Sequence, residues 1–229
     1  MLIKIKLAGI CNTDLEITSG YLGFEGTLGH EFVGIVKKDL KGDLENKRVV
    51  GSVNIPCGEC YMCKMGIEKH CRNMKAIGMR DRDGAFAEYM TLPRENVYTV
   101  PETISDREAV LVEPLAAGVE IIEENHLKPT DEVVILGDGK LGHSIARVLW
   151  AAEKDPVLIG KHQNKLDRVA ELGIDTICAS SPEAKGRVER ANQTLQDRLV
   201  KEMRLAGIDD YAQANAFLME YIPVYNQKF

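Results

Sequence analysis

A cluster of four cysteines within fifteen residues constrains the fold of this chain more than any other feature. The spacing is C-x2-C-x2-C-x7-C, and a tetrahedral Zn²⁺ takes four such thiolates on a tight loop with no open coordination position. The chain starts like a strand and not like a signal peptide, which favours metal ligation over disulfides. We predict a structural zinc loop, with reduced or disulfide-paired cysteines as the alternative. Its ligands would be Cys57, Cys60, Cys63 and Cys71.

The composition is that of an ordinary globular protein. The 229 residues are 45% hydrophobic and 28% charged, enough for a substantial core. The 29 Lys and Arg against 35 Asp and Glu give a net charge of −6, which argues against a dedicated nucleic-acid binder. The sequence lacks an apolar run of about 18 residues that could span a membrane. We therefore expect a cytoplasmic protein.

Three kinds of pattern follow one another along the chain. Short alternating stretches predict antiparallel strands at 3–7, 32–36, 47–53 and 85–92. From about 104 to 127 the apolar residues recur at helical spacing and predict a connecting helix or helix pair. One face of that helix would carry Ala109, Val112, Leu115, Ala116, Val119 and Ile122.

A strand, a glycine-rich loop and a helix begin near Asp131. The loop has the spacing G-x-G-x-x-G at Gly137, Gly139 and Gly142. Such glycines permit a tight turn and let backbone N–H groups approach a pyrophosphate at the helix N-terminus. Further strands predicted at 157–160 and 176–179, with a helix at 163–172 between them, complete a βαβαβ unit, which is half of a Rossmann sheet.

The position that would contact the adenosine ribose is not acidic. An NAD enzyme places Asp or Glu about twenty residues after the glycine loop, but the second strand here ends in Gly160, Lys161 and His162. Lys161 could pair with a 2′-phosphate, which favours NADP over NAD. A solvated lysine is the alternative.

A single cysteine and a single histidine occupy another part of the first hundred residues. The segments Cys11-Asn12-Thr13-Asp14 and Gly29-His30-Glu31 supply a thiolate, an imidazole and carboxylates. Taken alone, such residues are more often packing residues than metal ligands. Their position before the cysteine loop and the glycine loop gives them a second interpretation.

Six stretches in this order resemble the zinc-containing medium-chain dehydrogenase/reductase family, which includes the zinc alcohol and polyol dehydrogenases. They cover about residues 1–179 and comprise 9–14, 28–34, the four-cysteine loop, 83–89, 113–116 and the glycine loop. The resemblance implies an incomplete, β-rich GroES-like catalytic domain with connecting helices over 1–127. A partial Rossmann domain would follow over 128–180.

The same resemblance implies the site and the reaction. Hydride would pass from a zinc-bound alkoxide of a small alcohol or polyol to NAD(P), and the chain would bind two zinc ions, one structural and one catalytic. Thr13 would pass the alcohol proton outward, and Asp14 would hydrogen-bond the far nitrogen of the histidine ligand. The implied ligands of the catalytic zinc are Cys11, His30 and Glu113, with Glu31 as an alternative or water-linked carboxylate.

From about Ser181 the chain resembles the C-terminal end of an insertion-sequence transposase with an Asp-Asp-Glu core. The matching residues are 181–192 and 204–208, and Glu189 would be the last of the three carboxylates. Its two aspartate partners have no counterpart in this sequence. We expect a helical tail over 181–229, with helices at about 183–205 and 210–221 and a capping box between Ser180 and Glu183.

The catalytic domain is therefore expected to be truncated at both ends, and dehydrogenase activity to be impaired. A non-catalytic zinc-binding remnant of a gene fusion is the alternative, and a transposase fragment is a weaker one. An oligomer is possible, although the usual sheet-edge contacts of the family are expected to be lost.

Overall fold

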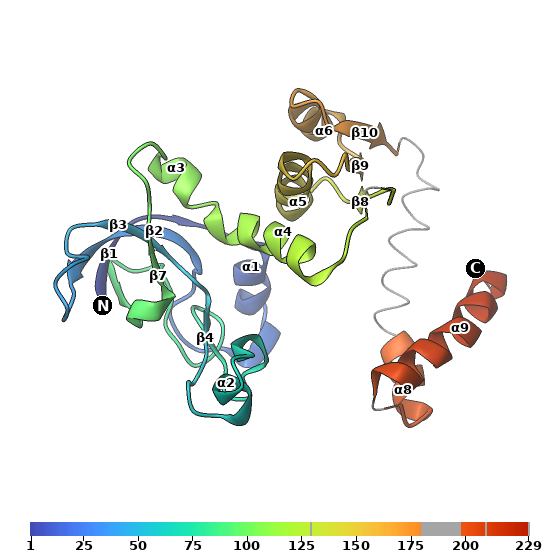
Figure 1. The fold of residues 1–229 in the computed structure, drawn as a ribbon, viewed down its shortest axis with the longest axis horizontal. Helices are drawn as coiled ribbons and strands as arrows, with labels where there is room; N and C mark the ends of the chain where they lie inside the picture. The colour runs from blue at the N-terminus through green and yellow to red at the C-terminus, as the bar shows by residue number, and fades with distance from the viewer. Residues whose placement is uncertain (129, 180–197, 209, 229) are drawn as a thin grey trace.

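The computed structural model describes residues 1–128, 130–179, 198–208 and 210–228 (Figure 1). A five-stranded antiparallel sheet and a three-stranded parallel sheet lie on either side of one connecting helix. The predicted order of a β-rich domain, a connecting segment and a βαβαβ unit is confirmed.

The antiparallel sheet has the strand order β6-β1-β2-β3-β7. Its predicted last strand at 85–92 is shorter than expected, because the backbone N–H groups of Gly84, Ala85 and Phe86 donate to carbonyls of residues 27–29 instead. The interior is formed by Ile3, Phe32, Val36, Val49, Ile77 and Leu92. The strands are β1 (Leu2–Gly9), β2 (Glu31–Lys38), β3 (Arg48–Gly51), β6 (Tyr89–Thr91) and β7 (Val97–Thr99), with a separate pair β4 (Asn54–Ile55) and β5 (Lys75–Ala76).

The connecting segment forms a helix pair, one of the two predicted alternatives. Ser105 and Glu108 form a capping box that starts α3, and Leu111, with non-helical ψ, precedes α4. The predicted apolar face is therefore interrupted, and Val112 and Val119 are exposed. The helices of this domain are α1 (Asn12–Thr18), α2 (Tyr61–Lys64), α3 (Asp106–Ala109) and α4 (Val112–Glu124), with short 3₁₀ turns η1 (Tyr21–Gly23), η2 (Glu68–His70) and η3 (Arg94–Asn96).

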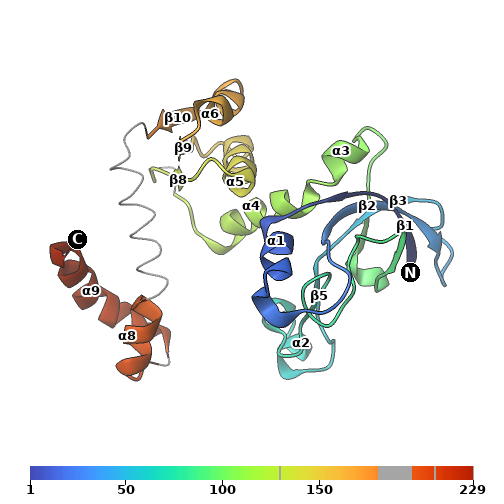
Figure 2. The same ribbon diagram turned by 180° about the vertical axis from the view of Figure 1, so that it is seen from behind.

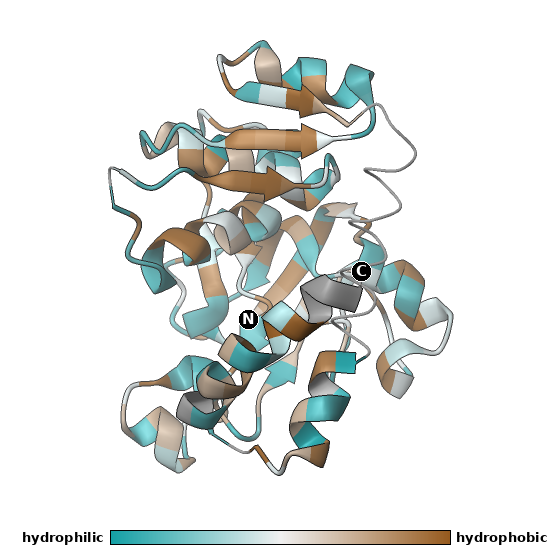
Figure 3. Ribbon diagram, turned by 90° about the vertical axis from the view of Figure 1, so that its right-hand side faces the viewer, coloured by the Kyte–Doolittle hydropathy of each residue, from teal (hydrophilic) through white to brown (hydrophobic). Residues whose placement is uncertain are grey.

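The parallel sheet has the order β10-β9-β8, and β8 and β9 are largely brown, that is hydrophobic, in Figure 3. Its core contains Ile135, Ala146, Leu149, Leu158, Leu166 and Val169. Helix α4 packs closely on α5, because a Cβ added at Gly118 would lie 3.1 Å from Val148 Cγ2. The elements are β8 (Val134–Leu136), α5 (Lys140–Ala151), β9 (Val157–Gly160), α6 (Gln163–Ala170) and β10 (Asp175–Cys178).

The tail contains two helices among the described residues, α8 (Val200–Leu205) and α9 (Tyr211–Lys228). Helix α9 confirms the predicted second helix and extends beyond it through Pro223. Both helices stand apart from the two sheets in Figures 1 and 2. The residues of the transposase resemblance from 181 to 192, Glu189 included, lie outside the described residues, as does the predicted capping box. None of the described helices is long and apolar enough to cross a membrane.

The first prediction concerns two glycines of one loop. A Cβ at Gly142 would overlap the carbonyl oxygen of Gly137, so Gly142→Ala must move backbone. We expect a loss of about 1–3 kcal/mol in the free energy of unfolding, the usual cost of overpacking. At Gly139 a Cβ would meet nothing within 4 Å and φ is −79°, so Gly139→Ala is the matched control. Its stability should be unchanged or raised by up to about 1 kcal/mol. Denaturant titration measures both, and equal stability of the two variants would contradict the packing argument.

Candidate metal and nucleotide sites

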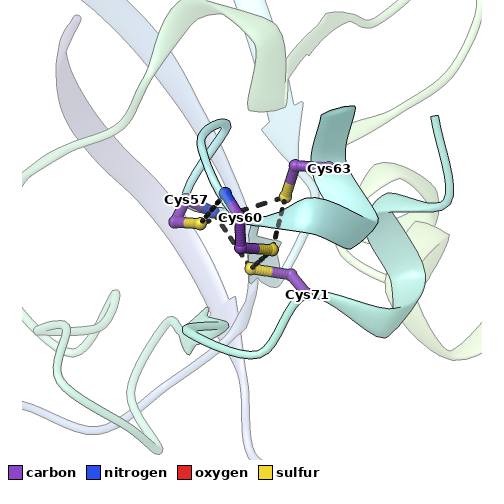
Figure 4. Close-up of side chains that lie close together, drawn as sticks. All are labelled: Cys57, Cys60, Cys63 and Cys71. Atoms are coloured by element: carbon purple, nitrogen blue, oxygen red, sulfur yellow. Dashed lines mark hydrogen bonds between the residues drawn. The ribbon is translucent and has the colours of Figure 1, made fainter. Parts of the chain in front are cut away.

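The four clustered cysteines converge on one point (Figure 4). Their Sγ atoms lie 3.5 Å apart for Cys60 and Cys63, 3.9 Å for Cys60 and Cys71, and 4.0 Å for Cys57 and Cys63. Four thiolates at about 2.3 Å from one tetrahedral Zn²⁺ would be about 3.8 Å apart. The sulfur positions therefore fit a closed zinc site, and the cysteines form no disulfide.

The protein environment shifts the pKa values of two of these thiols in opposite directions. The backbone N–H of Cys63 is the main cause that lowers the pKa of Cys60 to about 6. Burial raises the pKa of Cys63 to about 12. A cation at the centre of the cluster would allow all four to ionise together, which is how metal binding becomes coupled to folding in such loops.

The cysteine loop is tied to the connecting helix by a lysine. Lys69 Nζ donates to Glu120 Oε1 at 2.8 Å and to Glu124 Oε1 at 3.2 Å. These carboxylates raise the pKa of Lys69, and all three side chains are about half exposed. The interaction links the loop around η2 to α4.

A second group of donor atoms lies where β1 ends and β2 begins. The strands pair with Gly9 opposite Glu31, and a Cβ at Gly9 would overlap the Glu31 carboxylate. Cys11 lies two residues after the end of β1, and His30 directly precedes β2. Ligand atoms of Cys11, His30 and Glu31 all lie within 4.8 Å of one another. A thiolate, an imidazole and a carboxylate together form a donor set that Zn²⁺ accepts.

Asp14 holds the two halves of this group together. Its Oδ2 accepts the backbone N–H of Cys11 at 2.8 Å, and its Oδ1 accepts that of Gly29 at 3.2 Å. Nδ1 of His30 lies 3.5 Å from Asp14 Oδ1 without hydrogen-bond geometry, so this buried nitrogen contacts the carboxylate but has no hydrogen-bond partner among the described residues. The Thr13 hydroxyl lies 3.7 Å from the Cys11 sulfur. Asp14 therefore fixes backbone positions on both sides of the donor group.

Glu113 lies close to this group without joining it. It begins the first turn of α4 and is half-buried. Burial raises its pKa, and Glu31 and Asp14 raise it further while His30 lowers it. The structure thus brings Glu31 into the donor set, whereas Glu113 remains outside the group of mutually close ligand atoms.

The glycine loop has the shape expected for a dinucleotide. Gly137 has φ +117°, a conformation that favours glycine, and its N–H donates to Ile159 O at 2.8 Å. Gly139 is the N-cap of α5, and the space beside it is open. The first turn of α5 therefore presents backbone N–H groups and the positive end of the helix dipole to a ligand.

The glycine loop also touches the metal-ligand segment directly. Nζ of Lys140 donates to the carbonyl oxygen of Ile10 at 2.6 Å, one residue before Cys11. The sequence pattern does not reveal this contact, because 130 residues separate the two partners. It places the candidate nucleotide and metal sites side by side.

An acidic residue occupies the end of β9, but it comes from the glycine loop. Asp138 Oδ2 accepts the backbone N–H groups of Lys161 at 2.8 Å and His162 at 2.6 Å. Both of its oxygens lie 3.0 Å from Nδ1 of His162. The parallel pairing of β8 with β9 creates this contact, which loop spacing alone does not predict.

Comparison with known proteins shows that the first part of the chain is similar to dehydrogenases that have a GroES-like domain. Residues 1–102 match the family described as Alcohol dehydrogenase GroES-like domain. The L-threonine 3-dehydrogenase of Shewanella woodyi is 36% identical over 183 residues, which are 76% of this chain and 53% of that protein. The predicted GroES-like fold is therefore confirmed.

Two solved structures extend the likeness into the parallel sheet. A candidate zinc-binding dehydrogenase from Sinorhizobium meliloti 1021, bound to NADP, superposes with a TM-score of 0.71 at 33% identity, covering 79% of this chain and 54% of that one. A short chain alcohol dehydrogenase from Escherichia coli CFT073, complexed with NADH, has a TM-score of 0.71 at 28% identity, covering 83% and 58%. The chain thus spans a little more than half of the length of these relatives. Both sheets of this chain are thus similar in sequence and fold to parts of dehydrogenases.

The closed cysteine site yields the second prediction. Cys60→Ser should lower bound zinc by about one equivalent and loosen the loop, because metal binding and folding are coupled there. Elemental analysis of the purified chain measures the zinc. Cys178→Ser is the control, since Cys178 lies in β10 away from both donor groups and should leave the zinc content unchanged. Equal zinc in the two variants would contradict the assignment.

The third prediction separates the two candidate carboxylate ligands. Because Glu31 and not Glu113 lies within 4.8 Å of the other donors, Glu31→Gln should weaken zinc at this site more than Glu113→Gln. We expect a loss of at least about tenfold for Glu31→Gln, as loss of even an outer partner costs 10–100-fold. Competition against a chromophoric chelator, following the weaker of the two zinc sites, measures the affinity. A larger effect of Glu113→Gln would show that α4 supplies the ligand.

Proposed function

We propose that this chain carries the metal and dinucleotide sites of a zinc-dependent alcohol or polyol dehydrogenase. The observation that carries the proposal is the contact between the two sites. Lys140 of the glycine loop donates to Ile10, and Cys11, His30 and Glu31 gather within 4.8 Å beside it. Hydride transfer needs a substrate oxygen and a nicotinamide at adjacent positions, and this arrangement supplies neighbouring sites for both.

The donor group and the two residues beside it, Thr13 and Asp14, have different roles in the proposal. Cys11, His30 and Glu31 would hold the zinc, which supplies Lewis acidity toward the alcohol oxygen when bound. Asp14 fixes the backbone at Cys11 and Gly29 and so sets the spacing of the donors. Thr13, whose hydroxyl lies 3.7 Å from the Cys11 sulfur, is placed to accept the alcohol proton.

The four-cysteine loop has a supporting role. Its sulfur atoms fit a closed tetrahedral zinc, and such a site stabilises a fold without an open position for substrate. Through Lys69 and Glu120 the loop is attached to the helix that begins near Glu113. Loss of this zinc would therefore affect the donor group indirectly.

The substrate class is a small alcohol or polyol, and the cofactor is a nicotinamide dinucleotide. Gly137, Gly139 and Gly142 would hold the pyrophosphate of the cofactor. The net charge of −6 is in line with a protein that has no nucleic-acid partner. The proposed location is the cytoplasm. The described residues form the three strands of one mononucleotide half. The nicotinamide half of the cofactor would lie beyond β8, at the edge of this sheet.

The fourth prediction tests the function through turnover. We expect the zinc-loaded chain to oxidise small alcohols or polyols more slowly than about 1 s⁻¹, the low end of ordinary enzymes. Hydride transfer requires reacting atoms about 3–3.5 Å apart, and the described residues supply the strands of one mononucleotide half only. A scan of alcohols with NAD and NADP, read as nicotinamide absorbance, measures the rate.

Two variants give that scan its control. Cys11→Ser should abolish the residual turnover because it removes a zinc ligand, whereas Cys178→Ser should preserve it. Turnover that survives Cys11→Ser would contradict the proposed site. A rate within the ordinary range of about 1–10³ s⁻¹ would show that the cofactor is fully positioned after all. Failure to bind either dinucleotide would instead favour a non-catalytic zinc-binding protein.

A further inference from the structure

The end of β9 meets the glycine loop at a corner formed by Asp138, Gly160, Lys161 and His162. In an NAD enzyme a carboxylate at this strand end faces the ribose 2′-hydroxyl. Here the strand ends in Gly160, Lys161 and His162, and the carboxylate comes from Asp138 on the other side of the corner. A Cβ at Gly160 would overlap the Asp138 side chain, so the carboxylate lies directly against the strand end.

The Asp138 carboxylate is directed toward the protein. It is 6% exposed and accepts two backbone N–H groups while facing the imidazole of His162. Burial alone would raise the pKa of Asp138, but the hydrogen bonds from His162 and from the two amides lower it to about 2. With these donors in place and the residue 6% exposed, little of the Asp138 carboxylate is accessible to a ribose hydroxyl.

Cations gather on the α5 and α6 side of the same corner. Burial lowers the pKa of His143, and Arg147, Arg168 and Lys165 lower it further, while Asp138 opposes them. Arg147 on α5 also donates to the carbonyl oxygen of Arg168 on α6 at 3.5 Å. Arg147, Lys165 and Arg168 thus lie on the α5 and α6 side of the glycine loop, although the chain as a whole is acidic.

We propose that His162, oriented by Asp138, selects an adenosine that carries a 2′-phosphate and so makes the site specific for NADP. This inference rests on the proposed function, which requires a dinucleotide at the glycine loop. His162 is the specificity-determining residue, and Asp138 is a positioning residue that acts through it.

The geometry of the pair supports this division of roles. Nδ1 of His162 faces Asp138, so Nε2 is at the other side of the ring, and the side chain is 41% exposed. Because Nδ1 is turned toward Asp138, an N–H at Nε2 on the other side of the ring could donate to a phosphate, and a hydrogen bond to that anion is charge-assisted. Lys161, whose backbone is fixed by the same carboxylate, adds a positive charge.

The test uses the full chain with two adenine mononucleotides, 2′,5′-ADP and 5′-AMP, which match only the adenine side of the cofactor. Isothermal titration calorimetry measures both dissociation constants. We expect 2′,5′-ADP to bind at least about tenfold more tightly than 5′-AMP, the size of one charge-assisted hydrogen bond. His162→Asn should remove most of this preference and leave 5′-AMP binding within about twofold. His126→Asn, at an exposed histidine between α4 and β8, is the matched control and should keep the preference.

A double-mutant cycle separates positioning from general stability. Asp138→Asn should reduce the preference in the wild-type background but change it by less than about twofold in the His162→Asn background, because both residues act as one unit. Equal reductions in both backgrounds would overturn the positioning role of Asp138. Thermal unfolding of each variant identifies any loss of fold.

The remaining outcomes are distinct. Equal binding of the two nucleotides, or tighter binding of 5′-AMP, would overturn the inference and indicate that Asp138 itself accepts the ribose hydroxyl. Binding of neither nucleotide would contradict the nucleotide site of the proposed function, and the selectivity with it. A preference that survives His162→Asn would remove His162 from the site.

Discussion

The pairing of β1 with β2 is the constraint on which the candidate metal site depends. Gly9 lies opposite Glu31, so the end of one strand and the start of the next present Cys11, His30 and Glu31 at the same edge of the sheet. A shift of one residue would turn alternate side chains to the other face and separate these donors. The buried contacts of Ile3, Phe32 and Val36 resist such a shift, because it would expose them. The packing of the sheet thereby determines which donor side chains lie together at its edge.

Helix α4 connects this edge to the other parts of the molecule. Its first turn carries Glu113 near the donor group, Gly118 packs on α5, and Glu120 accepts Lys69 of the cysteine loop. The exposed ion pairs at Lys69 contribute little to stability, because solvent and salt screen them. The close approach at Gly118 has more weight, since a larger side chain there would push the helices apart. Packing between helices therefore sets the distance between the nucleotide loop and the metal site, and the lysine only orients the cysteine loop.

The sequence predicts local features well and cross-chain contacts poorly. The cysteine loop was predictable because its four ligands lie within fifteen residues, and the βαβαβ unit because its apolar runs and glycines follow a regular order. A helix pair was one of the predicted alternatives for the connecting segment, but the position of its break at Leu111 was not predictable, since the apolar residues from 109 to 122 have continuous helical spacing. The contacts of Lys140 with Ile10 and of Asp138 with His162 depend on tertiary packing across 130 and 24 residues. Whether Glu31 or Glu113 joins the donors depends likewise on where α4 begins.

Two buried aspartates make the same kind of hydrogen bonds, one at the candidate metal site and one at the candidate nucleotide site. Asp14 accepts the N–H groups of Cys11 and Gly29 and lies beside His30, while Asp138 accepts those of Lys161 and His162 and faces the His162 ring. In each case a buried carboxylate, in the first turn of α1 for Asp14 and in the glycine loop for Asp138, accepts backbone N–H groups next to or at a histidine and thereby fixes the backbone there. The two histidines differ in exposure, since His30 is 3% exposed and the side chain of His162 is 41% exposed. A buried imidazole next to a thiol and a carboxylate suits an ion enclosed by protein, whereas an exposed imidazole suits a group that arrives on a ligand from solvent. The same local chemistry can therefore serve metal binding at one end of the chain and cofactor selection at the other.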